Sequence, residues 1–527
     1  MKNLEIPLQS EKTKSYRFLE RLPAILSYSL LATPLILSQV SPRLTVVFIL
    51  AYILMWLVRA VGLNVRVLQG WRNSQKHQKY NWEQMLEDLE KREVTVKNPK
   101  WHKSNIERLD QYPGKIKPSE ALHVIMIAIY NESREIVEPT VKDVIDSNYD
   151  MKKVALIIAY EERGPEETRK LAVDLVKQYG DKFMYAHAIE HPEDIPHEVI
   201  GKGGNITYAA RIIEKTWLKK NKIDPNRVIL TTLDSDNRPH PNYLPALTYT
   251  YCLCPEPKYI SFQPIAMYTN NIWDAPALMR VIATGNSFWN IILTMRQHLI
   301  RNFSSHAQSM AALIDTDYWS VRTIVEDGHQ FWRTYFRYDG KHEVYPIYVP
   351  IYQDAVLADG YRRTLKMQFI QVRRWAYGAS DISYVITKGY LTKNKIPRWD
   401  MLTKTFRIVE GHVSWATAPL ILTFSAFVPI LFNPEDIAAN QLPNIVSNLQ
   451  RIAMVGLVIT VFLSFKALPP KPERYKRHRN IFMVLQWVLL PVSTIIYSSS
   501  AALNAQTRLL LGKYLDKFDV TEKAVKK

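Results

Sequence analysis

Two aspartates separated by one residue stand near the middle of the chain, directly after a short apolar run. The run is Arg227–Leu233, and Asp234-Ser235-Asp236 follows it. Side chains at i and i+2 of a strand lie on one face, so both carboxylates can face one hard cation. Such cations take oxygen ligands from a few carboxylates and from substrate phosphates. The motif predicts a Mg²⁺ or Mn²⁺ site on Asp234 and Asp236 that holds a diphosphate. An Asp/Asn turn at a strand end is the alternative.

A glycine-rich loop precedes this strand. Residues 201–205 contain three glycines and Lys202, and they open an expected helix that runs to Ile213. Glycines let the backbone approach a ligand, and a lysine near a helix start can meet a phosphate. The spacing is not that of the Gly-x-x-x-x-Gly-Lys phosphate loop. A phosphate contact by Lys202 and a flexible loop with an exposed lysine are therefore equal alternatives.

Two adjacent acids, Glu326 and Asp327, stand before an aromatic helix that includes Phe331–Phe336. A carboxylate there can act as a general base, which typically contributes 10²–10⁴-fold to a rate. The alternative is that Asp327 caps the amino end of the helix.

A later helix carries three polar side chains on one face. Gln371, Arg374 and Trp375 stand at positions i, i+3 and i+4, so they are neighbours on a helix surface. An amide, a guanidinium and an indole together can bind a diphosphate and stack on a sugar ring. The alternative is an ordinary amphipathic helix with a basic face.

Alternating apolar strands and helices indicate a mostly parallel α/β sheet that positions these groups. Helices are expected over 135–147 and 165–179, and strands over 123–130, 153–159, 184–188 and 228–233. Ligands of such sheets bind beyond the carboxyl ends of the strands. The polar residues expected at those ends are Asn131, Glu132, Glu161, Glu162, Asp234 and Asp236. The pattern predicts a nucleotide-type site along this edge.

The chain has 527 residues and a formal net charge of +18, which indicates an anionic partner, either nucleic acid or a membrane surface. Apolar runs over 23–40 and 44–63 approach the length of a membrane span, with only a tight turn between them. Both flanks of this pair are basic, which predicts a cytoplasmic side for each. Because most basic residues lie beside apolar runs and no nucleic-acid motif appears, we expect a membrane and no nucleic acid.

The C-terminal third contains three further apolar runs, over 413–432, 452–465 and 481–503. An acidic external loop is expected over 433–450, and a basic cytoplasmic loop after Lys466. A full crossing by the last run would put the basic tail outside. We therefore expect this run to re-enter the membrane or to lie in the interface, with a cytoplasmic tail; an external tail is the alternative.

Taken in order, the motifs resemble those of the membrane-embedded family 2 glycosyltransferases, the group with cellulose, chitin and hyaluronan synthases. The resemblance covers roughly residues 120–400, and Gln-x-x-Arg-Trp is its most specific part. It implies a GT-A fold, a nucleotide-sugar donor, a divalent cation and inversion at the anomeric carbon. The residues that carry it are Tyr130-Asn131-Glu132, Lys202-Gly-Gly-Asn205, Asp234-Ser-Asp236, Glu326-Asp327 and Gln371-x-x-Arg374-Trp375.

The resemblance also implies roles for individual residues. Asp234 and Asp236 bind the donor diphosphate and its metal, and Lys202 contacts the nucleotide. Asp327, beside Glu326, is the catalytic base. Tyr130, Asn131 and Glu132 line the base and ribose site. The leaving diphosphate and the acceptor sugar are held by Gln371, Arg374 and Trp375, and Arg374 also contacts the donor. The family often has aspartates after the second strand, where this chain has Glu161 and Glu162; a glutamate can still bind a uracil or ribose.

Together these observations predict an integral membrane hexosyltransferase, in the plasma membrane with a cytoplasmic catalytic domain. It moves a sugar from a nucleotide donor, UDP-hexose by preference, to a saccharide acceptor. Processive polysaccharide synthesis, single addition to a lipid or lipid-phosphate acceptor, and an inactive membrane scaffold or export partner are the alternatives. The expected segments are an N-terminal segment (1–22), a transmembrane hairpin (23–63), a juxtamembrane helical linker (64–118), the GT-A domain (119–400), C-terminal transmembrane or interfacial helices (401–511) and a basic tail (512–527).

Overall fold

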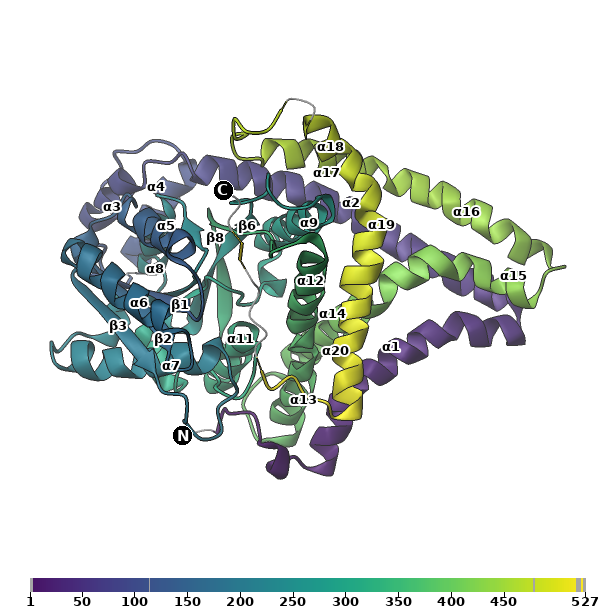
Figure 1. The fold of residues 1–527 in the computed structure, drawn as a ribbon, viewed down its shortest axis with the longest axis horizontal. Coiled ribbons are helices and arrows are strands. Elements are labelled where there is room, and N and C mark those ends of the chain that lie inside the picture. Colours follow the sequence, from purple (N-terminus) through teal and green to yellow (C-terminus); the bar gives the residue numbers. More distant parts are fainter. Residues whose placement is uncertain (1–2, 113, 477–478, 518–522, 525–527) are drawn as a thin grey trace.

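The computed structural model describes residues 3–112, 114–476, 479–517 and 523–524. An α/β domain and a set of long apolar helices make up these residues, and the two parts lie side by side (Figure 1). Of the expected basic tail, residues 518–522 and 525–527 lie outside the described residues.

The α/β domain is built on one eight-stranded mixed sheet in the order β3-β2-β1-β4-β7-β6-β8-β5. The first four strands are parallel. Strand β7 runs antiparallel to both β4 and β6, so β6 and its parallel neighbour β8 run in the direction of β4. The bounds are β1 Leu122–Ile129, β2 Val154–Glu161, β3 Tyr185–His191, β4 Val228–Asp234, β5 Arg238–Pro239, β6 Ile260–Tyr268, β7 Ala307–Ser309 and β8 Glu343–Gln353. The predicted strands are confirmed within a few residues at each end.

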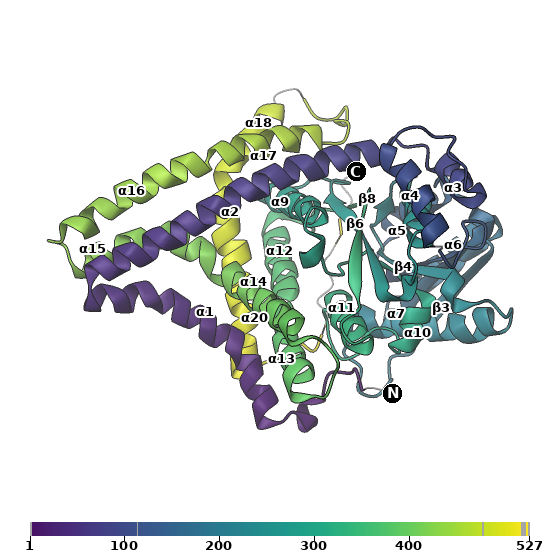
Figure 2. The ribbon, with the colours of Figure 1, turned by 180° about the vertical axis from the view of Figure 1, so that it is seen from behind.

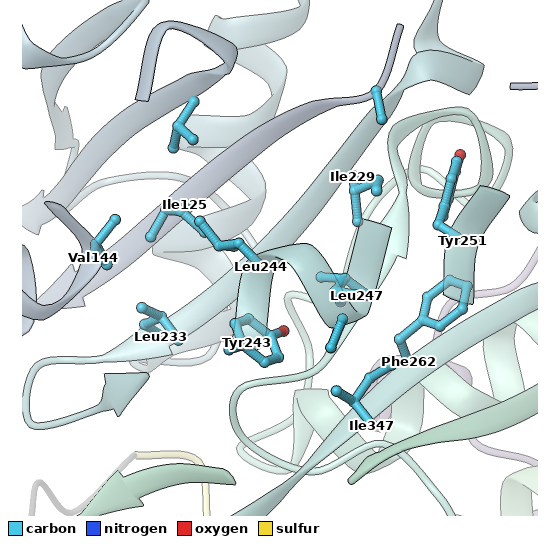
Figure 3. Packing of buried hydrophobic residues seen from close by; sticks show 14 of the residues in the cluster. Ile125, Val144, Ile229, Leu233, Tyr243, Leu244, Leu247, Tyr251, Phe262 and Ile347 are labelled. Atoms are coloured by element: carbon cyan, nitrogen blue, oxygen red, sulfur yellow. The ribbon is translucent and has the colours of Figure 1, made fainter. Parts of the chain in front are cut away.

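Helices cover both faces of the sheet because successive residues of a buried strand point to opposite faces. On one face, Ile125 of β1 packs in a cluster with residues of three helices, α5, α6 and α8; Figure 3 shows Leu244 of α8 next to Ile125. On the other face, Val124 packs with α7 and α10. The bounds are α5 Arg134–Ile145, α6 Glu166–Tyr179, α7 Lys202–Ile213, α8 Tyr243–Cys252 and α10 Met310–Asp315. Apolar residues on both faces of β1 explain the continuous apolar run in its sequence.

The segment expected to link the membrane and the domain packs onto the domain. Helices α3 (Trp82–Lys91) and α4 (Lys100–Gln111) add Trp82 and Leu89 to the same core cluster as α8. Between them, the Asp88 carboxylate lies 3.1 Å from His102 Nε2, and both side chains are buried. These two helices are therefore part of the folded α/β unit.

Among the described residues, five helical stretches are long and apolar enough to cross a membrane, by length and composition. Two of them, α1 and α2, form a hairpin at Ser41, whose hydroxyl accepts the Leu44 N–H. In Figures 1 and 2 this hairpin extends away from the sheet. A second hairpin, made of the stretch α14–α15 and the stretch α16–α17, extends to the same tip, and the fifth stretch runs across the base of both hairpins. The stretches are α1 Lys14–Val40, α2 Pro42–His77, Arg398–Phe432 (α14 and α15), Ile437–Lys466 (α16 and α17) and Arg479–Leu511 (α18 to α20).

The prediction of a loop over 433–450 is wrong for most of that range, because α16 (Ile437–Ala453) begins there. Asp436 starts the helix by accepting the Ala439 N–H at 2.9 Å. Leu442 and Val446 then pack against α2. The acidic pair Glu435 and Asp436 marked the turn correctly, but the uncharged residues after it continue as helix because they can bury one face.

Candidate active site

The Lys202 ammonium joins two motifs that lie far apart in the sequence. Its Nζ lies 2.8 Å from Asp234 Oδ1 and 3.4 Å from Asp327 Oδ2. Lys202 is the first residue of α7, and Asp327 lies in the first turn of α11 (Glu326–Arg337). The Lys202 side chain is only 8% exposed, so the alternative of an exposed lysine on a flexible loop is wrong.

Close packing requires a glycine at position 203, and a side chain at position 204 would have to displace the end of a glutamate. A Cβ on Gly203 would lie 2.6 Å from the Ser320 carbonyl oxygen and 3.2 Å from Glu326 Cβ. A Cβ on Gly204 would lie 2.5 Å from Glu198 Oε2. Gly203 therefore lets the start of α7 approach α11, which brings Lys202 to Asp327. We expected the glycines to approach a ligand, and in the structure they approach protein.

The turn after β4 is held by side chains on three sides. Glu132 accepts the Tyr130 N–H at 2.7 Å, the Asn131 N–H at 3.1 Å and the Ser235 hydroxyl at 3.0 Å. Asn237 Oδ1 accepts the Asp234 N–H at 2.8 Å. Glu132 thus fixes the ends of β1 and β4 to each other.

The loop before β7 completes the surroundings of Asp234. The Ser304 hydroxyl donates to Asp234 Oδ2 at 2.5 Å. In the same loop, His306 Nε2 accepts the Trp319 indole N–H at 3.1 Å, so the ring proton is on Nδ1, which donates to the Phe303 carbonyl oxygen. Burial lowers the pKa of His306, and its neutral ring lies with Nδ1 3.5 Å from Asp327 Oδ1. Nothing in the sequence around Ser304 or His306 indicated this position.

The two adjacent acids occupy the first turn of α11 without capping it. The N-cap residue is Val325, and no side-chain cap is present, so the capping alternative for Asp327 is wrong. Glu326 is 2% exposed. Within the part of the chain that the structure describes, Glu326 Oε2 and Asp327 Oδ1 are buried without a hydrogen-bond partner. Buried carboxylate oxygens without donors are costly, which is typical of a site that awaits a ligand.

The charged groups of this cluster shift one another's pKa values. Burial lowers the pKa of Lys202, but Asp234, Asp327 and Glu326 outweigh burial and raise it above its ordinary value. Conversely, burial raises the pKa of Asp234, and Lys202 and Lys523 outweigh it, so the pKa of Asp234 lies below the ordinary range. Burial and the neighbouring Asp327 together raise the pKa of Glu326 well above that of an ordinary carboxyl. Glu326 therefore holds its proton at a pH where Asp234 is ionised.

Replacing Glu326 with Gln is expected to make the protein more stable at alkaline pH and to change little in mild acid. A carboxyl whose folded pKa is raised adds stability that is fully present below its unfolded pKa and is lost as the pH rises through its folded pKa. Gln is neutral at every pH. The free energy of unfolding of the variant should therefore exceed that of wild type by at least about 1.4 kcal/mol at about pH 9, equivalent to one pKa unit. Thermal unfolding at about pH 5 and pH 9 measures it. The exposed Glu343, changed to Gln, is the matched control, and an equal effect of pH on both variants would contradict the shift.

The predicted helix that carries Gln371, Arg374 and Trp375 is present, and Trp375 lies near Tyr268, the last residue of β6. Helix α12 spans Tyr361–Ala376. The Trp375 ring lies 6.1 Å from the ring of Tyr268, between centroids. Tyr268 has a raised pKa, chiefly through burial, with Asp234 and Asp236 raising it and Arg374 opposing them. On α12, Gln371 accepts a hydrogen bond from Gln368 at 3.3 Å.

The acids after β2 form a separate group. Glu161 is buried and accepts from Arg163 Nε at 2.8 Å, and it lies 3.1 Å from His191 Nδ1. Glu198 contacts the other ring nitrogen at 2.9 Å. Burial lowers the pKa of His191, but the two carboxylates outweigh it and raise that pKa to about 9. Glu162 is exposed and accepts the Glu193 N–H at 3.1 Å.

Two residues that the sequence analysis missed contact Asp236. The Asp354 N–H donates to Asp236 Oδ2 at 3.1 Å, and burial followed by Asp236 raises the pKa of the Asp354 carboxyl. The Lys523 ammonium lies 2.8 Å from Asp236 Oδ1. Asp354 directly follows β8, so the rule that put polar residues at strand ends would have found it had β8 been predicted.

Three carboxyl groups at the Asp-x-Asp turn have the chemistry of ligands for a divalent cation. Asp234, Asp236 and Asp354 carry carboxyl oxygens, the ligand type that Mg²⁺ and Mn²⁺ prefer. Among the described residues, however, no three His, Cys, Asp or Glu side chains are arranged to hold a metal by themselves. A cation bound here would need phosphate oxygens to complete its coordination.

No protein-family model and no curated protein sequence matches the chain. Several solved structures resemble its fold distantly. The mannosyltransferase PcManGT from Pyrobaculum calidifontis, in complex with GDP-Man and Mn²⁺, matches with a TM-score of 0.40 and 10% identity over 86% of this chain and 100% of that one. S. aureus TarS 1-349 with UDP-GlcNAc matches with a TM-score of 0.34 and 11% identity over 75% and 93%. GalNAc-T7 with UDP, GalNAc and Mn²⁺ matches with a TM-score of 0.34 and 11% identity over 60% and 67%. These scores are low, so the function proposed below rests on this chain's own residues.

Proposed function

We propose that this protein is a membrane-bound glycosyltransferase that moves a sugar from a nucleotide-sugar donor to an acceptor hydroxyl. The observation that carries the proposal is the Lys202 ammonium between Asp234 and Asp327, which brings the Asp-x-Asp turn and the Glu-Asp helix start to one point. Trp375 lies on the same side, against Tyr268. The proposed diphosphate site and base are thus neighbours beyond the carboxyl end of β4, and the indole proposed for a sugar face lies against the last residue of β6, at the same edge of the sheet.

The reaction proposed is a single displacement with inversion. Asp327 takes the proton of the acceptor hydroxyl as its oxygen attacks the anomeric carbon. The bond from that carbon to the diphosphate oxygen breaks, and the nucleoside diphosphate leaves with the electron pair. Lys202 and Arg374 offset the charge that develops on it, and fixed charges in a partly dry site do this better than water. A Mg²⁺ or Mn²⁺ ion held by Asp234 and Asp236 would supply further charge compensation at the diphosphate.

We further propose that two helical hairpins insert into the bilayer and that the stretch Arg479–Leu511 lies across their base. Both described ends of the chain contact the α/β domain: Glu5 pairs with Arg333 at 3.1 Å, and Lys523 pairs with Asp236. This supports an even number of crossings. Within the fifth stretch, Gln486 accepts from the buried Arg280 of α9 (Ala277–Thr294) at 2.5 Å. Arg474, in the basic loop before it, pairs with Asp274 of the domain at 2.7 Å.

The catalytic domain lies on the cytoplasmic side in this proposal, because the basic loop lies on the domain's side; the membrane proposed is the plasma membrane. Helix α12, which carries the proposed acceptor residues, packs against α20 (Ser500–Leu511) at the base of the hairpins. An acceptor that arrives from the membrane side, either a growing saccharide or a lipid-linked hydroxyl, fits this position.

A donor screen tests the proposal. Purified protein is given UDP- and GDP-sugars with saccharide and lipid acceptors, with and without EDTA, and both nucleotide release and product size are measured. We expect acceptor-dependent release of one nucleoside diphosphate and its loss in EDTA. A long product identifies a processive synthase, and one sugar per acceptor identifies a single-addition enzyme. If no donor gives release above that of a chain with Asp327 changed to Asn, the scaffold alternative is favoured.

A further inference from the structure

The C-terminal end of the chain returns to the candidate active site. Lys523 forms a parallel bridge with Leu357, just after β8, and the Ala524 N–H donates to the Leu357 carbonyl oxygen at 2.8 Å. Earlier in the tail, Lys517 forms a bridge with Ile200, directly before the glycine-rich loop. The described tail therefore contacts the domain at both sides of the site.

The side chain of Lys523 forms an ion pair with the second carboxylate of the Asp-x-Asp turn, Asp236. Its Nζ lies 2.8 Å from Asp236 Oδ1 and donates to the Ser235 hydroxyl oxygen at 2.8 Å, across 288 positions of sequence. The other oxygen, Asp236 Oδ2, already accepts the Asp354 N–H. Lys523 and Asp236 are 16% and 10% exposed as side chains. The Lys523 ammonium thus occupies the one oxygen of Asp236 that does not accept the Asp354 N–H.

The contacts that hold residues 523 and 524 can be broken without disrupting the domain. Residues 523 and 524 are held by the backbone hydrogen bond to Leu357 and by the ammonium's contacts with Ser235 and Asp236. Contacts of this kind contribute modestly in net terms because water replaces them when they break. A tethered group nevertheless competes well, since its effective concentration is on the order of millimolar.

We propose that the C-terminal tail is an internal competitor of the divalent cation: Lys523 on Asp236 and Ser235 keeps the cation from the Asp-x-Asp turn until the tail is displaced. This deepens the proposed function, because the cation in question is the one that would hold the donor diphosphate. The tail then sets the metal and donor concentrations at which the site opens.

The first experiment measures Mn²⁺ binding rather than turnover. MnCl₂ is titrated, with UDP present, into full-length protein in detergent, and free Mn²⁺ is followed by electron paramagnetic resonance. We expect Lys523→Ala, and separately a chain ending at residue 522, to bind Mn²⁺ about tenfold more tightly than wild type, as expected when a charge-assisted contact is removed. Lys517→Ala removes an exposed lysine from the same tail and should stay within about twofold of wild type.

A second readout follows the tail itself. Trypsin cleaves after lysine, so MnCl₂ with UDP should accelerate cleavage after Lys523 in wild type, as measured by the mass of the product. Mn²⁺ affinity unchanged in both Lys523 variants overturns the proposal. So does a Lys523→Ala protein that loses sugar transfer at saturating Mn²⁺, since the ammonium would then be the working cation.

The two proposals fail separately. Tighter Mn²⁺ binding in the Lys523 variants with no transfer from any donor retains the competitor and removes the glycosyltransferase. Metal-dependent transfer with no effect of Lys523 on Mn²⁺ affinity retains the glycosyltransferase and removes the competitor.

Discussion

Replacing Asp327 with Asn is expected to lower the rate of sugar transfer by at least about 100-fold, the lower end for loss of a general base. Asn keeps the shape of Asp and cannot accept the hydroxyl proton. Lys202 keeps its 2.8 Å contact with Asp234 in the variant, so the affinity for UDP, measured by calorimetry, should change only a few-fold. A large loss in kcat with nearly constant nucleotide affinity separates the loss of a base from the collapse of the site.

The matched control for this substitution is Asp317→Asn. Asp317 is exposed, pairs with Arg211 at 2.9 Å and has a positive φ of 54°, a conformation that Asn tolerates. The variant should keep full activity. Transfer that persists in Asp327→Asn would mean that Glu326 acts as the base, because its pKa is raised partly by Asp327 and falls when that charge is removed. The double variant with Glu326→Gln would then be inactive.

Replacing Lys202 with Met is expected to reduce both stability and turnover. The ammonium is 8% exposed and is shared by Asp234 and Asp327, so its loss leaves carboxylates facing each other with less compensation. Loss of hydrogen bonds to charged groups costs about 1.5–3 kcal/mol, which thermal unfolding measures. Turnover should fall by at least about 100-fold, or about 2.7 kcal/mol in barrier. Unlike Asp327→Asn, this variant should also bind UDP more weakly.

A double-mutant cycle tests the reason for this effect. In Lys202→Met with Asp327→Asn, one of the uncompensated carboxylates is gone, so the stability cost should be smaller than the sum of the single costs. Lys215→Met, at an exposed lysine two residues beyond the end of α7, controls for the loss of a positive charge and should change neither stability nor turnover. Additive costs in the cycle would mean that Lys202 and Asp327 do not interact.

Much of the sheet was predictable because burial leaves a local signature. The runs that became β1, β2 and β4 are apolar on both faces, and this pattern needs no knowledge of the partners. The spacing of Asp234 and Asp236 at the end of β4, and of Gln371, Arg374 and Trp375 on one helix, also follows from local geometry alone.

The amino acid sequence therefore determined which segments form β1 to β4 and most of the apolar helices, and which acids stand at the end of β4. Only the tertiary structure decided what those acids contact. Lys202, Asp354 and Lys523 reach Asp234 and Asp236 from other parts of the chain, and a lysine in a charged tail looks like any exposed lysine in a sequence. The physical reason is that periodic burial is encoded within a few residues, whereas ion pairs depend on three-dimensional proximity between residues whose types give no sign of it.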